Sequence, residues 1–253
     1  MPKTATQKPC GILYYFDMAG RGDPPNMVAA YMGHHLQNIV IPLCARPYMV
    51  THMPGKWVPY LKKPSGEFMG ETQDITKYLA ELASPLGRKL KTDALQDEIF
   101  KMSNEPPISH ARGNDEDVKN GRPARNTVNP MFFESIGSFA KPNVLGGEKE
   151  VTIESFKKDT NEFWPALEKR LRSAVGPFFG GKEPGYGDIG LFAVITIVER
   201  HIQGFVLSVG PHFKVWYDAT YNLPGIKEYL TNRPQWHERK YGCLPLYTLD
   251  DLK

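Results

Sequence analysis

The chain has 253 residues, with 31 lysines and arginines against 28 aspartates and glutamates, which gives a formal net charge of +3. This length is sufficient for one large domain or two smaller ones with a buried core. Charges of both signs are mixed along the sequence and no nucleic-acid recognition motif is present, so we expect no nucleic-acid partner. A polyanion-binding module stays a third hypothesis, which strongly salt-dependent binding would support.

Cysteine usage and hydropathy limit the other classes. The three cysteines, Cys10, Cys44 and Cys243, lie far apart and form no C-x-x-C pair, and the histidines form no H-E-x-x-H motif, so we expect neither disulfides nor a metal site. The first ten residues lack the apolar stretch of a secretory signal, and a cytoplasmic location is expected. The longest apolar run, Leu191 to Val198, is far shorter than the roughly 20 residues that cross a bilayer, so no membrane association is expected.

The N-terminal segment alternates strand-like and helix-like patterns. Ile12 to Phe16 is an aromatic and β-branched run, which predicts a buried strand. A helix is expected next, with Asp23 as its cap, Pro24 at its first position and Gly33 at its end. Leu36 to Ile41 predicts a second strand. A strand, a helix and a strand in close order favour a βαβ unit with parallel strands.

Two short runs then predict a hairpin, Val58 to Leu61 and Glu67 to Met69. Pro59 lies inside the first run, where it removes a ladder hydrogen bond, so it is expected at a free edge, at a bulge or in a cis peptide. A helix is expected from Thr72, because apolar residues follow at helical spacing. Its apolar face contains Ile75, Tyr78, Leu79 and Leu82.

The remainder of the chain is expected to be helical. Apolar residues keep helical spacing from Phe156 to Leu171, Ile189 to Val198 is apolar all round as in a central helix, and a last helix containing Ile226, Tyr229 and Leu230 ends before Pro234. Residues 104–150 are rich in proline, glycine, asparagine and charge, which indicates a long insertion. The predicted fold is therefore βαβ-ββα followed by an all-helical part.

Four motifs, in this order and at this spacing, point to a family. They are Leu13 to Phe16 followed by Gly20-Arg21-Gly22-Asp23-Pro24; Val58-Pro59-Tyr60-Leu61; Glu71-Thr72 opening a helix; and Phe178-Phe179-Gly180-Gly181 followed by Pro184 to Asp188. Each is weak alone, but together they are a strong signal. The chain resembles the cytosolic glutathione transferases, closest to the sigma and mu type.

This resemblance implies a fold and an activity. Residues 1–84 would form a thioredoxin-like domain that binds glutathione, and residues 90–253 an all-helical domain that shapes a pocket for a hydrophobic electrophile. The enzyme would conjugate the glutathione thiolate to small electrophiles, as in detoxification, with glutathione as co-substrate and without a metal. Isomerisation and peroxide reduction use the same thiolate and are not separated by the sequence. The family also implies a homodimer.

Tyr15 is the candidate catalytic residue. A free cysteinyl thiol titrates near 8.5, so a site must stabilise the thiolate, and a hydroxyl that donates a hydrogen bond to sulfur does this. The family pattern places Tyr15 at the end of the first strand, and Tyr14 then faces the core by strand alternation. The alternative from the strand alone is that both tyrosines are core residues.

The remaining candidates would bind glutathione. Thr72 at a helix start offers a hydroxyl and N–H groups to a carboxylate, and Glu71 can hold the ammonium group. The alternative is that Thr72 is an ordinary helix cap. Val58 would pair with the cysteinyl backbone, with Pro59 in cis exposing the backbone groups or as a plain edge-strand proline. Arg21 is expected to support Tyr15 or to bind a carboxylate, and otherwise is a solvated charge. Asp188 is expected to cap the core helix, without a catalytic role.

The sequence also departs from the family. Residues 46–50 lack the Trp and Lys that usually hold the glycyl carboxylate, although Arg46 can substitute for them. Trp57 stands where a polar residue usually precedes the Val-Pro pair, and Lys56 can compensate. These departures favour a second hypothesis, a non-catalytic scaffold subunit of a larger assembly, with the insertion as the surface for a protein partner. The C-terminal residues 241–252 either cover the pocket or form a surface tail.

Overall fold

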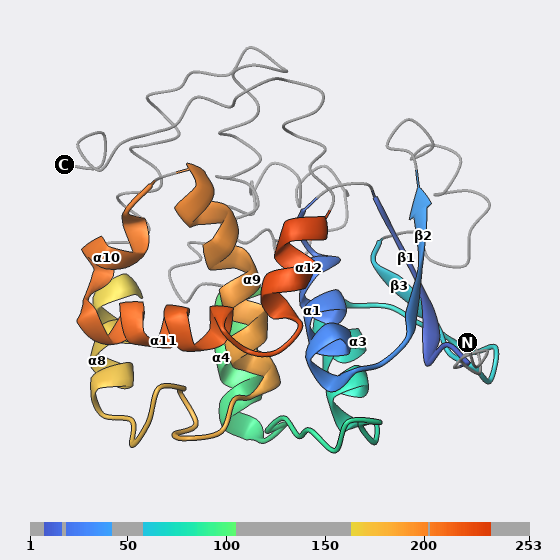
Figure 1. Cartoon of the computed structure of the whole chain (residues 1–253), viewed down its shortest axis with the longest axis horizontal. Coiled ribbons are helices and arrows are strands. Elements are labelled where there is room, and N and C mark those ends of the chain that lie inside the picture. The colour runs from blue at the N-terminus through green and yellow to red at the C-terminus, as the bar shows by residue number, and fades with distance from the viewer. Residues whose placement is uncertain (1–7, 17–18, 42–57, 105–162, 202, 234–253) are drawn as a thin grey trace, which may run out of the picture.

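The computed structural model describes residues 8–16, 19–41, 58–104, 163–201 and 203–233 (Figure 1). Three sets of predictions lie outside this part of the chain. They concern residues 105–162, which hold the predicted insertion and the first part of the helix predicted from Phe156, residues 46–57, and the C-terminal residues 241–252. The N-terminal elements are β1 (Gly11–Phe16), α1 (Asp23–Met32), β2 (Leu36–Ile41), β3 (Tyr60–Lys62), β4 (Phe68–Met69) and α3 (Thr72–Glu81). The helical elements are α4 (Ala94–Asn104), α8 (Phe163–Arg172), α9 (Tyr186–His201), α10 (Phe205–Val209), α11 (Pro211–Tyr221) and α12 (Ile226–Asn232).

The four described strands form one sheet in the order β2-β1-β3-β4. β1 and β2 are parallel, whereas β1 with β3 and β3 with β4 are antiparallel. The predicted βαβ-ββα arrangement is therefore confirmed, as is the all-helical part that follows. The domain bounds of 1–84 and 90–253 stay a prediction.

Helices α1 and α3 pack against each other and lie between the sheet and the helical part (Figure 1). α9 is the central helix, because side chains all around it are buried, including Ile189, Leu191, Phe192 and Ile195 at 0% exposure. α12 comes late in the sequence but lies beside α1 (Figure 1). One apolar core thus joins the two parts of the chain.

The start of α1 differs from the prediction. Gly22 occupies the cap position, Asp23 is the first helical residue, and no side chain caps the helix. The predicted cap role of Asp23 is therefore wrong, and Pro24 is the second helical residue. The physical reason is that the Asp23 carboxylate reaches backwards and accepts a hydrogen bond from the Gly20 N–H at 3.0 Å.

Two findings on the described residues concern membrane-spanning helices and metal-binding clusters. None of the helices placed there combines the length and the hydropathy needed to cross a bilayer. The same residues contain no group of three or more His, Cys, Asp or Glu side chains arranged to hold a metal ion.

Candidate active site

The strand directions bring three predicted site segments to one end of the sheet. Tyr14 on β1 pairs with Tyr60 on β3, so the next position in this antiparallel register places Tyr15 opposite Pro59. β4 is antiparallel to β3 and therefore runs in the direction of β1. The chain leaves β4 at the same end and begins α3 at Thr72. The end of β1, the start of β3 and the first turn of α3 thus lie at one edge.

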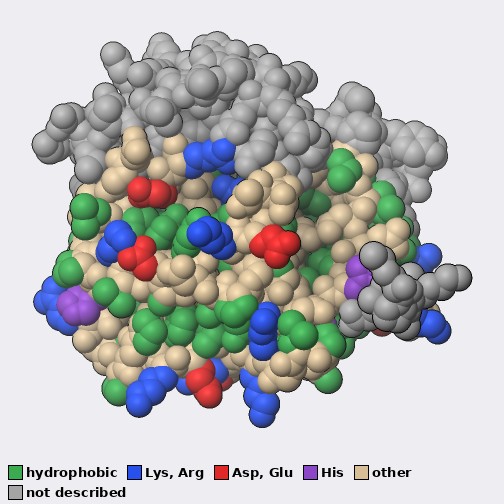
Figure 2. All heavy atoms as spheres, in the orientation of Figure 1, with side chains coloured by type: hydrophobic (Ala, Val, Ile, Leu, Met, Phe, Trp, Pro, Cys, Tyr) green, Lys and Arg blue, Asp and Glu red, His purple; other side chains and the backbone are tan. Residues whose placement is uncertain are grey.

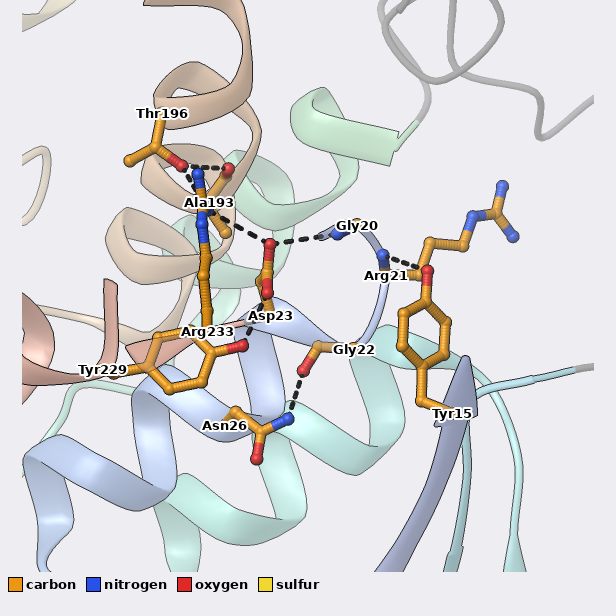
Figure 3. Close-up of polar contacts among 10 residues, drawn as sticks. All are labelled: Tyr15, Gly20, Arg21, Gly22, Asp23, Asn26, Ala193, Thr196, Tyr229 and Arg233. Carbon is orange, nitrogen blue, oxygen red and sulfur yellow. Dashed lines mark hydrogen bonds and ion pairs between the residues drawn. The ribbon is translucent and has the colours of Figure 1, made fainter. Parts of the chain in front are cut away.

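Tyr15 is held by the loop that follows its strand. Its hydroxyl oxygen accepts a hydrogen bond from the backbone N–H of Arg21 at 2.9 Å (Figure 3). A tyrosine hydroxyl has one proton and two lone pairs, so this bond uses a lone pair and leaves the proton. Within the described part of the chain, that proton has no acceptor. The hydroxyl is therefore able to donate to a ligand.

The loop is shaped to the tyrosine ring. A Cβ added to Gly22 would lie 2.4 Å from Cδ1 of Tyr15, so the ring packs directly on the glycine backbone. Gly20 has a φ of 152°, which side chains rarely allow. The two glycines therefore permit the close approach that brings the Arg21 N–H to the hydroxyl. The Arg21 side chain itself extends away from Asp23 (Figure 3).

Tyr15 is protonated at neutral pH. Burial, and to a smaller extent the negative charge of Asp23, raise the pKa of its hydroxyl. The Arg21 N–H, the Arg21 charge and the Gly22 N–H lower this pKa but do not outweigh burial. A protonated hydroxyl is a hydrogen-bond donor, and such a donor lowers the pKa of a thiol that it contacts. The prediction that Tyr14 faces the core is wrong: Tyr14 is only partly buried and its ring stacks on Tyr60, with 4.6 Å between centroids, whereas Leu13 is the β1 residue in the core, at 0% exposure.

The first turn of α3 has an unusual geometry. Glu71 is the only non-glycine residue with positive φ in the described part of the chain, at φ 61° and ψ 125°. Such backbone strain costs about 1–3 kcal/mol and is typical of ligand sites. Glu71 occupies the cap position and no side chain caps α3, so the alternative that Thr72 is the cap is wrong. Thr72 is buried, at 6% exposure.

The peptide bond between Val58 and Pro59 is cis, as one of the three expectations for Pro59 had it. Pro59 is buried at the edge that faces Tyr15 in the register. Val58 lies before the first residue of β3, so its backbone is outside the strand pairing with β1. The candidates Lys56 and Trp57 lie outside the described residues, and their roles stay predictions.

A buried polar network lies on the opposite side of the Gly20–Gly22 loop from Tyr15 (Figure 3). The Asp23 carboxylate, 1% exposed, accepts the Gly20 N–H at 3.0 Å and the Tyr229 hydroxyl at 2.5 Å. Arg233, 5% exposed, lies with Nη1 at 3.3 Å from Asp23 and donates to the Thr196 hydroxyl at 3.0 Å. Burial raises the pKa of Asp23, and Arg233, Tyr229 and the Gly20 N–H oppose that shift.

Sequence reasoning missed this network. Tyr229 was expected only as part of an apolar helix face, and Arg233 and Thr196 were not singled out. Asp23 and Arg233 are 210 positions apart, so no local pattern connects them. The one available signal was an unusual pair of features, an aspartate in a glycine turn and an arginine immediately before Pro234, neither of which defines a partner.

On the face drawn in Figure 2, lysines and arginines are interspersed with acidic and apolar side chains and form no continuous basic stripe. This pattern does not favour the polyanion-binding hypothesis for that face, since nucleic-acid binders concentrate basic residues.

Comparisons with known proteins concern the fold of the chain. Residues 133–233 match the family model "Glutathione S-transferase, C-terminal domain". No curated protein sequence matches the chain. The structure is similar to a glutathione S-transferase from Ascaris lumbricoides, at 21% identity and a TM-score of 0.66, covering 90% of this chain and 100% of that one.

Two further solved structures share the fold. A prostaglandin synthase D of Nilaparvata lugens has 18% identity and a TM-score of 0.60, covering 89% of this chain and 99% of that one. A glutathione transferase from Phanerochaete chrysosporium, solved with oxidized glutathione, has 14% identity and a TM-score of 0.68, covering 93% of this chain and 100% of that one. At these identities, each likeness concerns the fold.

The fold is that of the glutathione transferases, a thioredoxin-like sheet with helices followed by a helical domain. The family model and the fold together confirm the resemblance of the chain to the cytosolic glutathione transferase family. The sigma- or mu-like class stays a prediction.

Proposed function

We propose that the chain is a glutathione transferase in which Tyr15 stabilises the glutathione thiolate. The observation that carries the proposal is the Tyr15 hydroxyl, which accepts the Arg21 N–H at 2.9 Å and keeps its own proton for a ligand. A hydroxyl held in this way is preorganised to donate, so it need not rearrange when the thiolate forms.

The neighbouring segments support the same proposal for glutathione binding. The first turn of α3 presents N–H groups and the positive end of the helix dipole to the γ-glutamyl carboxylate, and Thr72 adds a hydroxyl. Glu71, which is exposed beside it, holds the ammonium group. The Val58 backbone, outside the strand pairing before cis Pro59, pairs with the cysteinyl backbone.

The chemistry is nucleophilic attack by sulfur. The thiol proton leaves to solvent, the thiolate is held by the Tyr15 O–H, and its lone pair forms a bond to carbon of the electrophile. In a substitution, the leaving group departs with the bonding electron pair. In an addition to an activated double bond, sulfur bonds to one carbon and the resulting carbanion takes up a proton from solvent. A hydrogen bond to a charged group contributes about 1.5–3 kcal/mol, so Tyr15 accounts for about tenfold to hundredfold more thiolate.

The finer expectations from the resemblance are part of this proposal. The electrophile is small and hydrophobic, the protein acts in the cytoplasm in detoxification, and two copies form a homodimer. Sedimentation of the purified chain tests the last of these, since a monomeric mass contradicts it.

The experiment measures glutathione binding by calorimetry and conjugation to a chlorinated nitrobenzene. Tyr15→Phe removes the donor and keeps the ring, and is expected to lower turnover about tenfold to hundredfold with a smaller effect on affinity. Tyr14→Phe is the matched control, because its ring stacks on Tyr60 on the same strand. It should retain wild-type turnover.

Two outcomes would contradict the proposal. Equal turnover in Tyr15→Phe and wild type would remove the role of the hydroxyl. No binding at millimolar glutathione would favour the alternative of a non-catalytic scaffold subunit, in which residues 46–50 lack the groups that hold glutathione.

A further inference from the structure

A buried ion pair joins the helical domain to the loop that holds Tyr15. Asp23 opens α1 and Arg233 follows α12, and their side chains are 1% and 4% exposed. Removing one partner of such a pair leaves a charge that water cannot reach. Replacing either residue should therefore disturb the other, and the pair lies on the opposite side of the Gly20–Gly22 loop from Tyr15 (Figure 3).

The Asp23 carboxylate is fixed through both of its oxygens. Oδ2 accepts the Gly20 N–H at 3.0 Å and lies 3.3 Å from Arg233 Nη1. Oδ1 accepts the Tyr229 hydroxyl at 2.5 Å. Because Gly20 precedes Arg21, the carboxylate that fixes Gly20 also sets the position of the next N–H group, the one that reaches Tyr15.

The helical domain holds Arg233 independently of Asp23. Arg233 Nη1 donates to the Thr196 hydroxyl on α9 at 3.0 Å, and that hydroxyl donates its own proton to the Ala193 carbonyl at 2.7 Å. The Thr196 oxygen is thus oriented as an acceptor. Since a guanidinium is always charged, the contact with Thr196 on α9 holds a permanent cation, Arg233, beside Asp23.

We propose that Arg233 is a positioning residue for Tyr15: through Asp23 it holds the Gly20–Gly22 loop in place and neutralises the charge behind the hydroxyl. This inference rests on the proposed function. Without Arg233, Asp23 is a buried anion without a cation, and its field at Tyr15 opposes a second negative charge on a bound thiol. The loop also loses the anchor that aligns the Arg21 N–H.

The test compares Arg233→Gln with wild type by three measurements. The first is the pKa of the thiol of bound glutathione, from thiolate absorbance against pH, and the second is glutathione affinity by calorimetry. The third is the Arg21 amide signal in NMR spectra of the ligand-free protein. We expect about tenfold less thiolate at a given pH below the thiol pKa, which is one pKa unit, with a smaller change in affinity and a shifted Arg21 amide.

Three further variants make the test specific. Asp23→Asn combined with Arg233→Gln removes both buried charges and keeps an acceptor oxygen for Gly20, so thiol ionisation should return close to wild type. Arg233→Lys keeps the charge and should rescue part of the effect. Arg170→Gln is the matched control, since Arg170 forms an ion pair with Glu98 at 2.8 Å between α8 and α4. It should leave the thiol unchanged.

The outcomes separate the two proposals. If wild type neither binds glutathione nor ionises its thiol, the proposed function fails, and the Arg21 amide still reports whether Arg233 controls the loop. An unchanged amide and an unchanged thiol pKa in folded Arg233→Gln would overturn the inference. If that variant does not fold, Tyr229→Phe and Arg233→Lys replace it. An unchanged Arg21 amide and an unchanged thiol pKa in both of these variants would likewise overturn the inference.

Discussion

Two buried turns of this protein share the pattern Gly-x-Gly-Asp, residues 20–23 before α1 and residues 185–188 at the start of α9. In each, the aspartate accepts a hydrogen bond from the N–H of the first glycine, at 3.0 Å for Asp23 and 2.9 Å for Asp188. Their exposures are 1% and 0%. The two turns are thus locally alike, and their differences lie in what surrounds them.

The second residue of each turn sends its N–H to a different kind of acceptor. Arg21 donates to the Tyr15 hydroxyl at 2.9 Å, whereas Tyr186 donates to the Lys91 carbonyl at 3.1 Å. A hydroxyl that accepts a hydrogen bond still has a proton to donate, but a carbonyl has none. The first turn therefore supports a chemical group, and the second only joins two segments of the backbone.

The aspartates also differ in their other donors. Asp188 accepts from the Phe179 N–H and the Trp216 indole, both neutral and both at 3.0 Å. Asp23 has Arg233 and the Tyr229 hydroxyl instead. The comparison teaches that two locally similar turns acquire different surroundings through their partners, which come from distant parts of the chain.

The largest expected effect comes from disrupting the second turn, residues 185–188, at the start of α9. Asp188→Ala leaves three buried N–H groups without an acceptor, on Phe179, Gly185 and Trp216. Each such group costs about 1–3 kcal/mol, so we expect the free energy of unfolding to fall by about 4 kcal/mol, measured by urea denaturation. The thiol pKa of bound glutathione should be unchanged. A loss below about 1 kcal/mol would contradict this description of the turn.

The second prediction concerns pH. Burial, opposed by its three N–H donors and Gln96, raises the pKa of Asp188 to about 6 from 3.8. Between these values the folded state holds one more proton than the unfolded state. Stability should therefore fall as pH rises from about 4 to about 6, by up to about 3 kcal/mol, and level off above.

Asp188→Asn is the control for this slope, because an amide does not titrate. Glu98, whose pKa the Arg170 hydrogen bonds lower, changes stability in the opposite sense, so the quantity to compare is the difference between wild type and variant. If the difference in unfolding free energy between wild type and Asp188→Asn is the same at pH 4 and pH 6, Asp188 has the same pKa in the folded and unfolded states, and the prediction is contradicted.

The third prediction sharpens the contrast in charge. Arg233→Gln and Asp23→Asn each leave one buried charge, while the double variant leaves none. The two losses of unfolding free energy should therefore not add, with a coupling of about 2 kcal/mol in the double-mutant cycle. Among the residues that the structure describes, Asp188 has no cationic partner, so the matched cycle of Asp188→Asn with Trp216→Phe should show a smaller coupling. Additive losses at Asp23 and Arg233 would contradict the ion pair.

The fold was predictable because it follows from local patterns. The run from Ile12 to Phe16, the apolar face after Thr72 and the all-apolar stretch from Ile189 to Val198 each fix an element through periodicity. Boundaries were less predictable: Asp23 was expected as a cap because aspartate favours that position, but the buried network redirects its carboxylate to Gly20. Tertiary contacts here override a local preference.

The site was predictable only where the family motifs reach. The position of Tyr15 and the cis bond before Pro59 follow from the resemblance, and the structure puts both at one end of the sheet. The contacts of Arg233 with Asp23 and Thr196 depend on how α12 and α9 pack, which one sequence does not determine. The roles of the candidate residues remain for the experiments above.

The smallest expected effect on stability, and the most specific on chemistry, comes from the third residue of each turn. A Cβ on Gly22 would lie 2.4 Å from the Tyr15 ring, and one on Gly187 would lie 2.3 Å from the Gln96 backbone oxygen. Gly22→Ala must displace Tyr15, a side chain, so we expect about 1 kcal/mol of stability lost. Because the Arg21 N–H and the hydroxyl then separate, thiolate formation on bound glutathione should fall as well.

Gly187→Ala is the matched variant for this comparison. Its clash is with backbone that cannot rotate away, so its loss of stability should be at least as large, while thiolate formation per folded molecule stays at the wild-type level. Thiolate absorbance, normalised to the folded fraction from circular dichroism, measures both. If the two variants lost thiolate equally, proximity to Tyr15 would not be what distinguishes the turns, and the catalytic assignment of the first turn would be wrong.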